Sequence, residues 1–265
     1  MFFLAPLTVV LLTSIKPLAE VHGGTLLSLP QEPTFAPWLH AWFDACTGID
    51  CSGIRVGFWN SVRIAAASVF VSVMSAALCG YALSRWRTNI SNVMFSMLVL
   101  CSFIPYQMIL YPMVRVHSVL GTYGTLAGIV LVHLAFSLPM LTLIFRNFYI
   151  SLPEELVKAA RVDGAGFFRI FFSIMLPLSP GMLAVALILN FTHVWNDYLL
   201  SLTFAGRANQ PMTVALNNLV NASESVKQYN VDMAATIIAT LPTLLIYIFA
   251  GRHFVRGITS GAVKG

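Results

Sequence analysis

Six apolar runs dominate the chain and alternate with shorter polar segments. They cover residues 1–15, 61–83, 93–114, 125–145, 174–200 and 234–255. A helix of roughly 20 apolar residues crosses a bilayer core about 30 Å thick, and such a helix satisfies its own backbone polar groups inside hydrocarbon. The pattern therefore predicts an all-α, polytopic membrane protein built as a six-helix bundle.

The first run is short for a membrane span. It begins with Phe2 and Phe3 directly after Met1, without the basic residues and the small-residue cleavage site of a signal peptide. We interpret it as a first span that is clipped or that begins close to the inner surface, and whether the N-terminus is complete stays open. The resulting division places the first span and an outer loop in residues 1–60, and a core of five spans in residues 61–265.

Composition supports a membrane location. The chain is 58% hydrophobic and only 9% charged, whereas a soluble domain usually carries about 25% charged residues. A core cannot absorb that many apolar side chains in 265 residues, so lipid must solvate many of them.

Lysine and arginine set the predicted orientation. With the N-terminus inside, nine of the 15 Lys and Arg residues fall on the cytoplasmic side, in line with the positive-inside rule. Basic clusters at residues 84–87 and 252–256 flank span ends on that side. The formal net charge of +5 is therefore a topology signal. It predicts no nucleic-acid partner, because no basic stripe with interleaved aromatic residues lies on a soluble face.

Two long polar segments are predicted to lie outside, residues 16–60 and 205–232. The first contains Cys46 and Cys51, and an outer loop is oxidising, so a disulfide between them and two free thiols are both open. No His or Cys pair stands nearby at the spacing of a zinc site. Cys79 and Cys101 lie in predicted spans, and we interpret them as packing residues.

Prolines interrupt several predicted spans. Pro105 and Pro112 fall in the third span, Pro177 and Pro180 near the inner end of the fifth, and Pro242 in the sixth. A proline inside a helix removes a backbone hydrogen bond and kinks the helix. Ordinary kinking and a bundle that rearranges around a pathway are both compatible with this pattern.

The predicted cytoplasmic loop at residues 151–173 carries the most informative pattern in the chain. Ser151 is expected to cap a helix and Glu154 to close a capping box. Gly164 is expected to end that helix in the left-handed conformation, and a second helix is expected to start near Phe167 and to enter the fifth span.

Four residues recur at helical spacing in this loop and predict one small, mildly apolar face: Leu156, Ala159, Ala160 and Asp163. A short helix with small residues on one face and charges around it suits a groove on a partner protein. A generic interfacial helix–turn–helix between the fourth and fifth spans is the alternative.

The loop resembles the EAA loop of the permeases of ABC importers. Ala159-Ala160 is followed after three residues by Gly164, and after nine more by Ile174-x-Leu176-Pro177. The resemblance implies that the loop docks on an ATPase subunit. The residues implied in this coupling are Glu154, Glu155, Lys158, Ala159, Ala160, Asp163 and Gly164.

Lys158 departs from the family pattern, which usually has Glu at this position. Three explanations stay open for the reversed charge. Glu154 and Glu155 supply the acid instead, the groove on the partner has changed, or coupling is lost.

Further stretches are similar to the carbohydrate-importer branch of these permeases. Leu176-Pro177-Leu178 is followed downstream by Trp195-Asn196-Asp197-Tyr198, and Gly57-Phe58-Trp59-Asn60 is similar to glucose- and mannose-type importers. The resemblance implies the fold of a type I ABC importer permease, in a sugar importer of a bacterial inner membrane. It also implies a second permease subunit, two ATPase subunits and a periplasmic sugar-binding protein as partners.

Candidates for the sugar pathway are Tyr106, Gln107, Trp195, Asn196 and Asp197, since aromatic rings stack on sugars and amides bond to them. Interfacial anchoring and helix packing explain these residues equally well, and Asp197 is as readily a helix-end group.

His133 and His193 lie in predicted spans, where an ionisable residue is a functional candidate. A neutral histidine that bonds between helices is the favoured interpretation.

Motifs of catalysis are absent from the sequence. It contains no G-x-x-x-x-G-K-[ST] phosphate loop, no H-E-x-x-H and no G-x-S-x-G. We therefore predict a transport subunit without a catalytic, cofactor or metal site, with ATP and Mg²⁺ bound by the partner ATPase.

The alternative is an ion-coupled secondary transporter or channel subunit, for which acidic residues deep in the spans and symmetric halves are expected. Which sugar is carried, and which of the two permease subunits contacts it, stays open.

Overall fold

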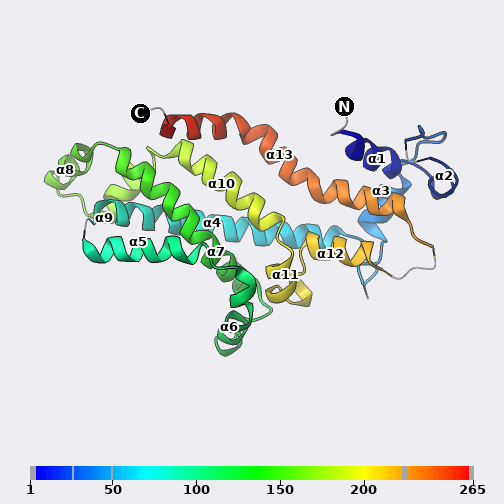
Figure 1. The fold of residues 1–265 in the computed structure, drawn as a ribbon, viewed down its shortest axis with the longest axis horizontal. Helices are drawn as coiled ribbons and strands as arrows, with labels where there is room; N and C mark the ends of the chain where they lie inside the picture. The colour runs from blue at the N-terminus through cyan, green and yellow to red at the C-terminus, as the bar shows by residue number, and fades with distance from the viewer. Residues whose placement is uncertain (1–3, 26, 49, 87, 223–225, 263–265) are drawn as a thin grey trace. The chain divides into compact units, whose positions relative to one another are not determined.

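The computed structural model describes residues 4–25, 27–48, 50–86, 88–222 and 226–262, the last stretch from 252 onward by its backbone alone. The described chain forms helices and loops and contains no strand, which confirms the all-α prediction. The elements, shown in Figure 1, are α1 (Ala5–Ser14), α2 (Leu18–Gly23), α3 (Ala36–Phe43), α4 (Arg55–Arg85), α5 (Asn89–Cys101), α6 (Tyr106–Val119), α7 (Leu126–Ser151), α8 (Glu154–Val162), α9 (Phe167–Ile170), the π-helix η2 (Phe171–Met175), α10 (Pro180–Trp195), α11 (Leu199–Phe204), the 3₁₀ helix η3 (Arg207–Asn209), α12 (Met212–Val220) and α13 (Tyr229–Ala262). Arg87, Lys264 and the first three residues of the chain lie outside the described residues, as do the side chains of Arg252 and Arg256.

Three helices among the described residues are long and apolar enough to cross a membrane alone: α4, α7 and the Tyr229–Gly251 part of α13. Two helix pairs reach the necessary length only together, α5 with α6 and the segment Phe167–Met175 with α10. The first apolar run forms α1, which has ten residues and is shorter than a span. Within the described chain, five of the six predicted spans therefore have a counterpart, and two of these five are broken.

Both broken spans bend where the sequence has prolines. α5 and α6 meet at 108°, and Pro105 is the N-cap of α6. The segment Phe167–Met175 meets α10 at 91°, and α10 begins at Pro180. Proline lacks the backbone N–H that would continue the preceding helix, so the chain turns at these two points. Pro112 and Pro242 instead lie inside continuous helices.

The chain packs as two compact units. Unit 1 comprises Met1–Ile64 and Trp195–Leu245, and unit 2 comprises Ala65–Val194 and Ile246–Gly265. This grouping differs from the predicted division, because a stretch from the second half of the chain packs with the N-terminal residues. Both predicted outer segments belong to unit 1, and the predicted cytoplasmic loop belongs to unit 2.

Unit 1 has a core shared by α3, α12 and the first turns of α4 and α13. Its buried members are Ala41, Ala45, Ile54, Met212, Leu219, Val231, Ala234 and Ala235. Asn60 Nδ2 donates to the carbonyls of Ala208 and Gln210, each at 3.1 Å. Ser61 Oγ accepts from the Met212 amide at 2.8 Å. These bonds satisfy backbone groups of the segment before α12 and fix that segment to α4.

In unit 2, most of α6 extends away from α5 and α10 (Figure 1). α4 and α7 approach each other closely at Gly80. A Cβ atom at Gly80 would lie 2.7 Å from the Phe145 Cβ and 2.8 Å from the Arg146 amide nitrogen. Only a residue without a side chain fits there, so this glycine sets the distance between the two helices.

Gly80→Ala is expected to destabilise the protein. The added methyl group overpacks the contact between α4 and α7, which typically costs about 1–3 kcal/mol. The melting temperature of the detergent-solubilised protein measures the effect. Gly251→Ala is the matched control, because a Cβ at Gly251 meets no atom within 4 Å. Equal melting temperatures for the two variants would contradict the close helix approach.

Candidate functional site

The short helix α8, in the polar loop after α7, ends in a Schellman turn. The Ala165 amide donates to the Ala160 carbonyl at 2.9 Å, and the Gly164 amide donates to the Arg161 carbonyl at 3.0 Å. Gly164 has a φ of +79°, the left-handed conformation that the sequence predicts, which glycine adopts without a clash of a Cβ atom. The turn satisfies two carbonyls at the end of α8 and redirects the chain towards α9.

The start of α8 differs from the predicted capping box. Pro153 is the N-cap, and no side chain there bonds to a backbone amide of the helix. Ser151 is the last residue of α7, where its Oγ donates to the Phe148 carbonyl at 2.7 Å. The capping prediction was wrong because α7 continues through Ser151. Glu154 and Glu155 occupy the first turn of α8, where a negative charge is favourable beside the helix N-terminus.

α8 has a buried side and an exposed side. Val157 and Ala160 are buried, with 3% and 8% of their surface exposed. Leu156 and Val162 are 41% and 89% exposed, and Ala159 is exposed with them. The prediction that Ala160 shares one face with Leu156 and Ala159 was therefore wrong, because Ala160 lies on the buried side of α8, which packs against the rest of unit 2. We call the apolar strip of Leu156, Ala159 and Val162 the α8 outer face.

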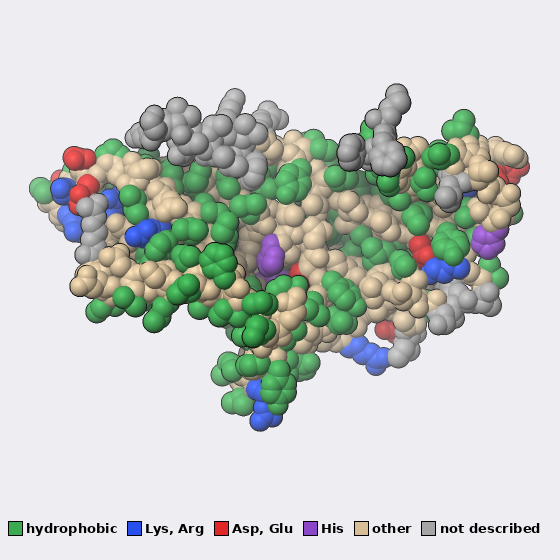
Figure 2. Space-filling view, in the orientation of Figure 1, with side chains coloured by type: hydrophobic (Ala, Val, Ile, Leu, Met, Phe, Trp, Pro, Cys, Tyr) green, Lys and Arg blue, Asp and Glu red, His purple; other side chains and the backbone are tan. Residues whose placement is uncertain are grey.

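Charged side chains gather over α8, as Figure 2 shows at that end of unit 2. Lys158 Nζ lies 3.7 Å from Glu154 Oε2, and both side chains are largely exposed. Such an i,i+4 pair contributes only about 0.3–0.5 kcal/mol. Three more charged residues of the loop are exposed: Glu155, Arg161 and Asp163. An apolar strip with charges of both signs around it has the anatomy of a protein–protein contact.

An aromatic cluster beside this helix was missed by the sequence reasoning. Phe167 of α9 and Phe171 of η2 stack on Tyr81 of α4, and Tyr81 has no exposed surface. The available signal was the repeated Phe-Phe pair at 167–168 and 171–172, which places two rings one helical turn apart. Tyr81 itself gave no signal, since it lies in an apolar run more than 80 residues earlier.

Trp195 and Asp197, two of the predicted pathway residues, stabilise the packing of unit 1. Trp195 is 3% exposed, and its Nε1 donates to the Ala239 carbonyl at 2.9 Å. The Asp197 carboxylate accepts from the amides of Leu200 and Ser201 at 3.2 and 2.7 Å. It therefore caps the N-terminus of α11, and of its two interpretations the geometry favours the helix-end group.

The remaining pathway candidates are exposed side chains. Tyr106 and Gln107 begin α6 in unit 2, and Asn196 lies in unit 1. The Tyr106 ring contacts the Phe136 ring edge to face, with 6.1 Å between the centroids. The five pathway candidates thus belong to two separate compact units, and their contact with a substrate stays a prediction.

His133 of α7 and His193 of α10 meet within unit 2. Their ring centroids lie 6.3 Å apart with the planes nearly perpendicular, and His133 is fully buried. Among the described residues, no group of three or more His, Cys, Asp and Glu is arranged to hold a metal ion. The pair is a helix–helix contact between two titratable rings.

A disulfide joins Cys46 and Cys51 in the first predicted outer segment. Asn218 Nδ2 of α12 donates to the Thr47 carbonyl in that loop at 3.5 Å. Cys79 and Cys101 are free, and Cys101 is exposed at the end of α5, so the packing interpretation does not hold for it within this chain. The disulfide therefore fixes a loop of unit 1 beside α12.

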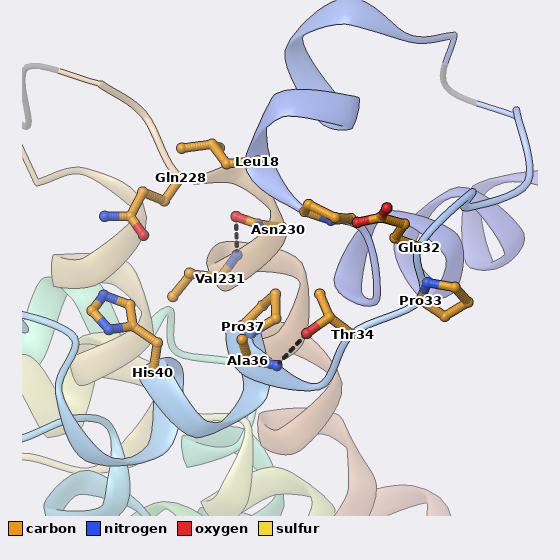
Figure 3. A pocket seen from close by; sticks show the side chains of 11 residues that line it. Leu18, Glu32, Pro33, Thr34, Ala36, Pro37, His40, Gln228, Asn230 and Val231 are labelled. Atoms are coloured by element: carbon orange, nitrogen blue, oxygen red, sulfur yellow. Dashed lines mark hydrogen bonds between the residues drawn. The ribbon is translucent and has the colours of Figure 1, made fainter.

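A surface pocket of about 650 Å³ lies in unit 1 and draws on both predicted outer segments (Figure 3). Its lining includes Leu18, Glu32, Pro33, Thr34, Pro37, His40, Gln228, Asn230 and Val231. The Asn230 amide is already bonded, since Nδ2 donates to the Lys16 carbonyl at 2.9 Å and Oδ1 accepts from the Val231 amide at 3.0 Å. Sequence reasoning selected none of these residues, because only the fold brings their segments together.

The sequence matches a family of known proteins. Residues 68–260 match the family model described as "Binding-protein-dependent transport system inner membrane component". A probable ABC transporter permease protein of Pyrococcus horikoshii is 42% identical over 180 residues, which cover 68% of this chain and 65% of that relative. The match thus spans less than two thirds of that relative's length. A xylose/arabinose import permease protein of Haloferax volcanii is 29% identical over 98% of this chain and 89% of its own.

A solved structure shares the fold. It is a bacterial ABC transporter involved in the import of the acidic polysaccharide alginate, and it matches with a TM-score of 0.81 at 22% sequence identity. The match covers 96% of this chain and 91% of the matching chain. This chain therefore shares its fold with the matching chain of that transporter.

Asp197→Ala is expected to lower the stability of the detergent-solubilised protein by about 1 kcal/mol, the usual cost of losing an N-cap side chain. Asp197→Asn is the matched control, since an asparagine oxygen still accepts a bond from the first turn of α11. Thermal unfolding of both variants measures the difference. If the Asn variant loses as much stability as the Ala variant, the charge of Asp197 matters and the capping role is insufficient.

Proposed function

The chain belongs to the family of binding-protein-dependent transport system inner membrane components, and we propose that it is one of two transmembrane subunits of an ATP-driven importer for a sugar. In this proposal two separate ATPase subunits hydrolyse ATP. When the ATPase subunits close, α8 moves with them and transmits this movement to the spans. The spans then alternate between outward and inward openings. The membrane is the cytoplasmic membrane of a prokaryotic cell, in a bacterium the inner membrane.

The α8 outer face carries the proposal. α8 has only nine residues, and Val157 and Ala160 already attach its other side to unit 2. Val162 is 89% exposed and therefore does nothing for the packing of this chain. Burying such a side chain against a partner contributes roughly 1.5–3 kcal/mol, so the outer face is suited to a groove on an ATPase subunit.

The charges around α8 fit the same role. Glu154 and Glu155 stand exposed in the first turn, and Lys158 replaces the glutamate that the resemblance implies. We propose that Glu154 and Glu155 supply the acid of the contact. The weak bond between Glu154 and Lys158 is given up at little cost when the ATPase subunit binds.

The two compact units support the orientation. Both predicted outer segments lie in unit 1, and α8 lies in unit 2. We place the periplasmic sugar-binding protein on unit 1, where the pocket of Figure 3 provides a concave surface built from both outer segments. The disulfide between Cys46 and Cys51 suits this oxidising side of the membrane.

The substrate class rests on similarity. The relative from Haloferax volcanii is a xylose/arabinose import permease, and the structural neighbour is involved in the import of alginate. Both substrates are carbohydrates, which supports a carbohydrate for this chain. The motif Trp195-Asn196-Asp197-Tyr198 supports the same branch through its resemblance, although Trp195 and Asp197 serve packing in unit 1.

Affinity purification of the tagged chain from native membranes in mild detergent tests the proposal. Mass spectrometry is expected to identify an ATPase subunit, present twice per complex, and a second permease. A chain that elutes alone or as a homo-oligomer, under conditions that keep a known ABC complex intact, would contradict the proposal. That result would favour an ion-coupled secondary transporter.

Gly164→Val is expected to uncouple transport while leaving membrane insertion and assembly intact. A β-branched residue at a φ of +79° costs roughly 1–2 kcal/mol. The Schellman turn therefore opens, and the direction of the chain from α8 to α9 is no longer fixed. Sugar uptake and ATP hydrolysis by the reconstituted complex measure coupling, and uptake per ATP is expected to fall.

Gly166→Val is the matched control for this variant. Gly166 lies two residues further along the same loop and has an extended φ of −75°, and neither glycine has an atom within 4 Å of an added Cβ. The control is expected to transport normally. Normal uptake by Gly164→Val would exclude the coupling role of the turn.

A further inference from the structure

Four aromatic rings form a continuous stack between the end of α4 and the segment that follows α8. The Trp86 ring stacks on Phe167 with 5.5 Å between centroids, Phe167 stacks on Tyr81 with 4.8 Å, and Tyr81 stacks on Phe171 with 5.8 Å. The planes of each pair lie within 30° of parallel, at 26°, 29° and 27°. We call these four residues the aromatic column.

The column interleaves two parts of the chain. Tyr81 lies near the end of α4 and Trp86 directly follows that helix, whereas Phe167 belongs to α9 and Phe171 to η2. The rings alternate between the two parts, so the Tyr81 ring lies between two rings that are one helical turn apart. Any slide of α9 and η2 along α4 would break both stacks on Tyr81 at once.

Burial concentrates this contact on Tyr81 and Phe171, which are 0% and 1% exposed. The Tyr81 hydroxyl has no hydrogen-bond partner among the described residues. Among the described residues, ring contacts and no hydrogen bond of the hydroxyl therefore hold the Tyr81 side chain in place. Aromatic pairs of this kind contribute beyond the area that they bury.

The geometry of the loop explains why a lateral contact is needed. α9 and η2 have four and five residues, and the segment Phe167–Met175 then bends by 91° before α10. A push along this short segment is not in line with α10. α4, in contrast, is one continuous helix of 31 residues, and the aromatic column is stacked on its end. A π-helix at this point, which often marks a functional site, adds a segment able to rearrange.

Neighbouring contacts secure the end of α4. Arg85 Nη2 donates to the Tyr149 carbonyl of α7 at 3.1 Å. The Tyr149 ring contacts Tyr81 edge to face with 6.1 Å between centroids, and Ser179 Oγ donates to the Tyr149 hydroxyl at 3.3 Å. Tyr81 therefore lies where α4, α7 and the segment after α8 meet.

We propose that the aromatic column is the contact through which movement of α8 reaches α4, and that Tyr81 is the positioning residue of this contact. The inference rests on the proposed function, because α8 must be driven by an ATPase subunit for its movement to matter. The Schellman turn passes the displacement of α8 to α9, and the stacked rings pass it to α4.

The test uses the whole importer, reconstituted in proteoliposomes with its ATPase subunits, second permease and binding protein. Tyr81→Leu removes the ring and keeps the apolar character, and Phe167→Leu removes the same stack from the other side. Tyr81→Phe is the matched control, since it keeps the ring and loses only the hydroxyl. Subunit co-purification, ATP hydrolysis and uptake of labelled sugar are measured for each complex.

Both Leu variants are expected to assemble and to hydrolyse ATP near the wild-type rate, while uptake per ATP falls about tenfold, the effect of losing two stacked pairs. Tyr81→Phe is expected to keep the wild-type ratio. A purely structural role would lower assembly, hydrolysis and uptake together, so the ratio separates positioning from folding.

Three outcomes would overturn the inference. The Leu variants keep the wild-type ratio of uptake to hydrolysis, both fail to assemble, or Tyr81→Phe loses coupling as strongly as Tyr81→Leu. Failure of the proposed function is distinguishable, because the wild-type chain would then not co-purify with an ATPase subunit at all.

Discussion

The left-handed turn at Gly164 is the constraint on which the arrangement of the segments between α7 and α10 depends. A φ of +79° lets the amides of Gly164 and Ala165 bond back to α8, which ends the helix after nine residues. Because α8 ends there, Phe167 can lie against α4 instead of continuing outward. The turn thus creates two surfaces at once: the exposed outer face of α8 and the buried stack around Tyr81. A side chain at this glycine would strain both.

Much of this could be predicted from the sequence, for identifiable reasons. Among the described residues, the apolar runs correspond to three helices and two bent helix pairs long enough to cross a membrane, because lipid imposes a length on each span. Pro105 and Pro180 mark the bends of the two pairs because proline cannot continue a helix. Gly164 was predictable because few residues adopt a positive φ. The burial of Ala160 was not, since helical spacing gives the period of a pattern and not the direction of the core. Tyr81 and the pocket of unit 1 join segments distant in sequence, and no local pattern contains such pairs.

The functional residues proposed from the motifs fall into different physical classes. The side chains of those in and after α8 are exposed except for Ala160. Trp195 and Asp197, in contrast, are bonded to the backbone of unit 1. A conspicuous motif therefore reports packing at one place, and we propose that it serves recognition at another. Only the hydrogen bonds and the exposure of the side chains distinguish a packing motif from a recognition motif. The same criterion directs attention to the α8 outer face and away from Asp197.

Site-directed photocrosslinking in the assembled importer tests most directly whether α8 docks on an ATPase subunit. A photoreactive residue replaces Val162 of the outer face, and the control replaces Val220 of unit 1, which is also exposed, at 39%. Illumination is expected to join residue 162 to the ATPase subunit and to leave residue 220 unjoined to it. A crosslink from residue 162 to lipid or to the second permease, with none to the ATPase subunit, would contradict docking through α8.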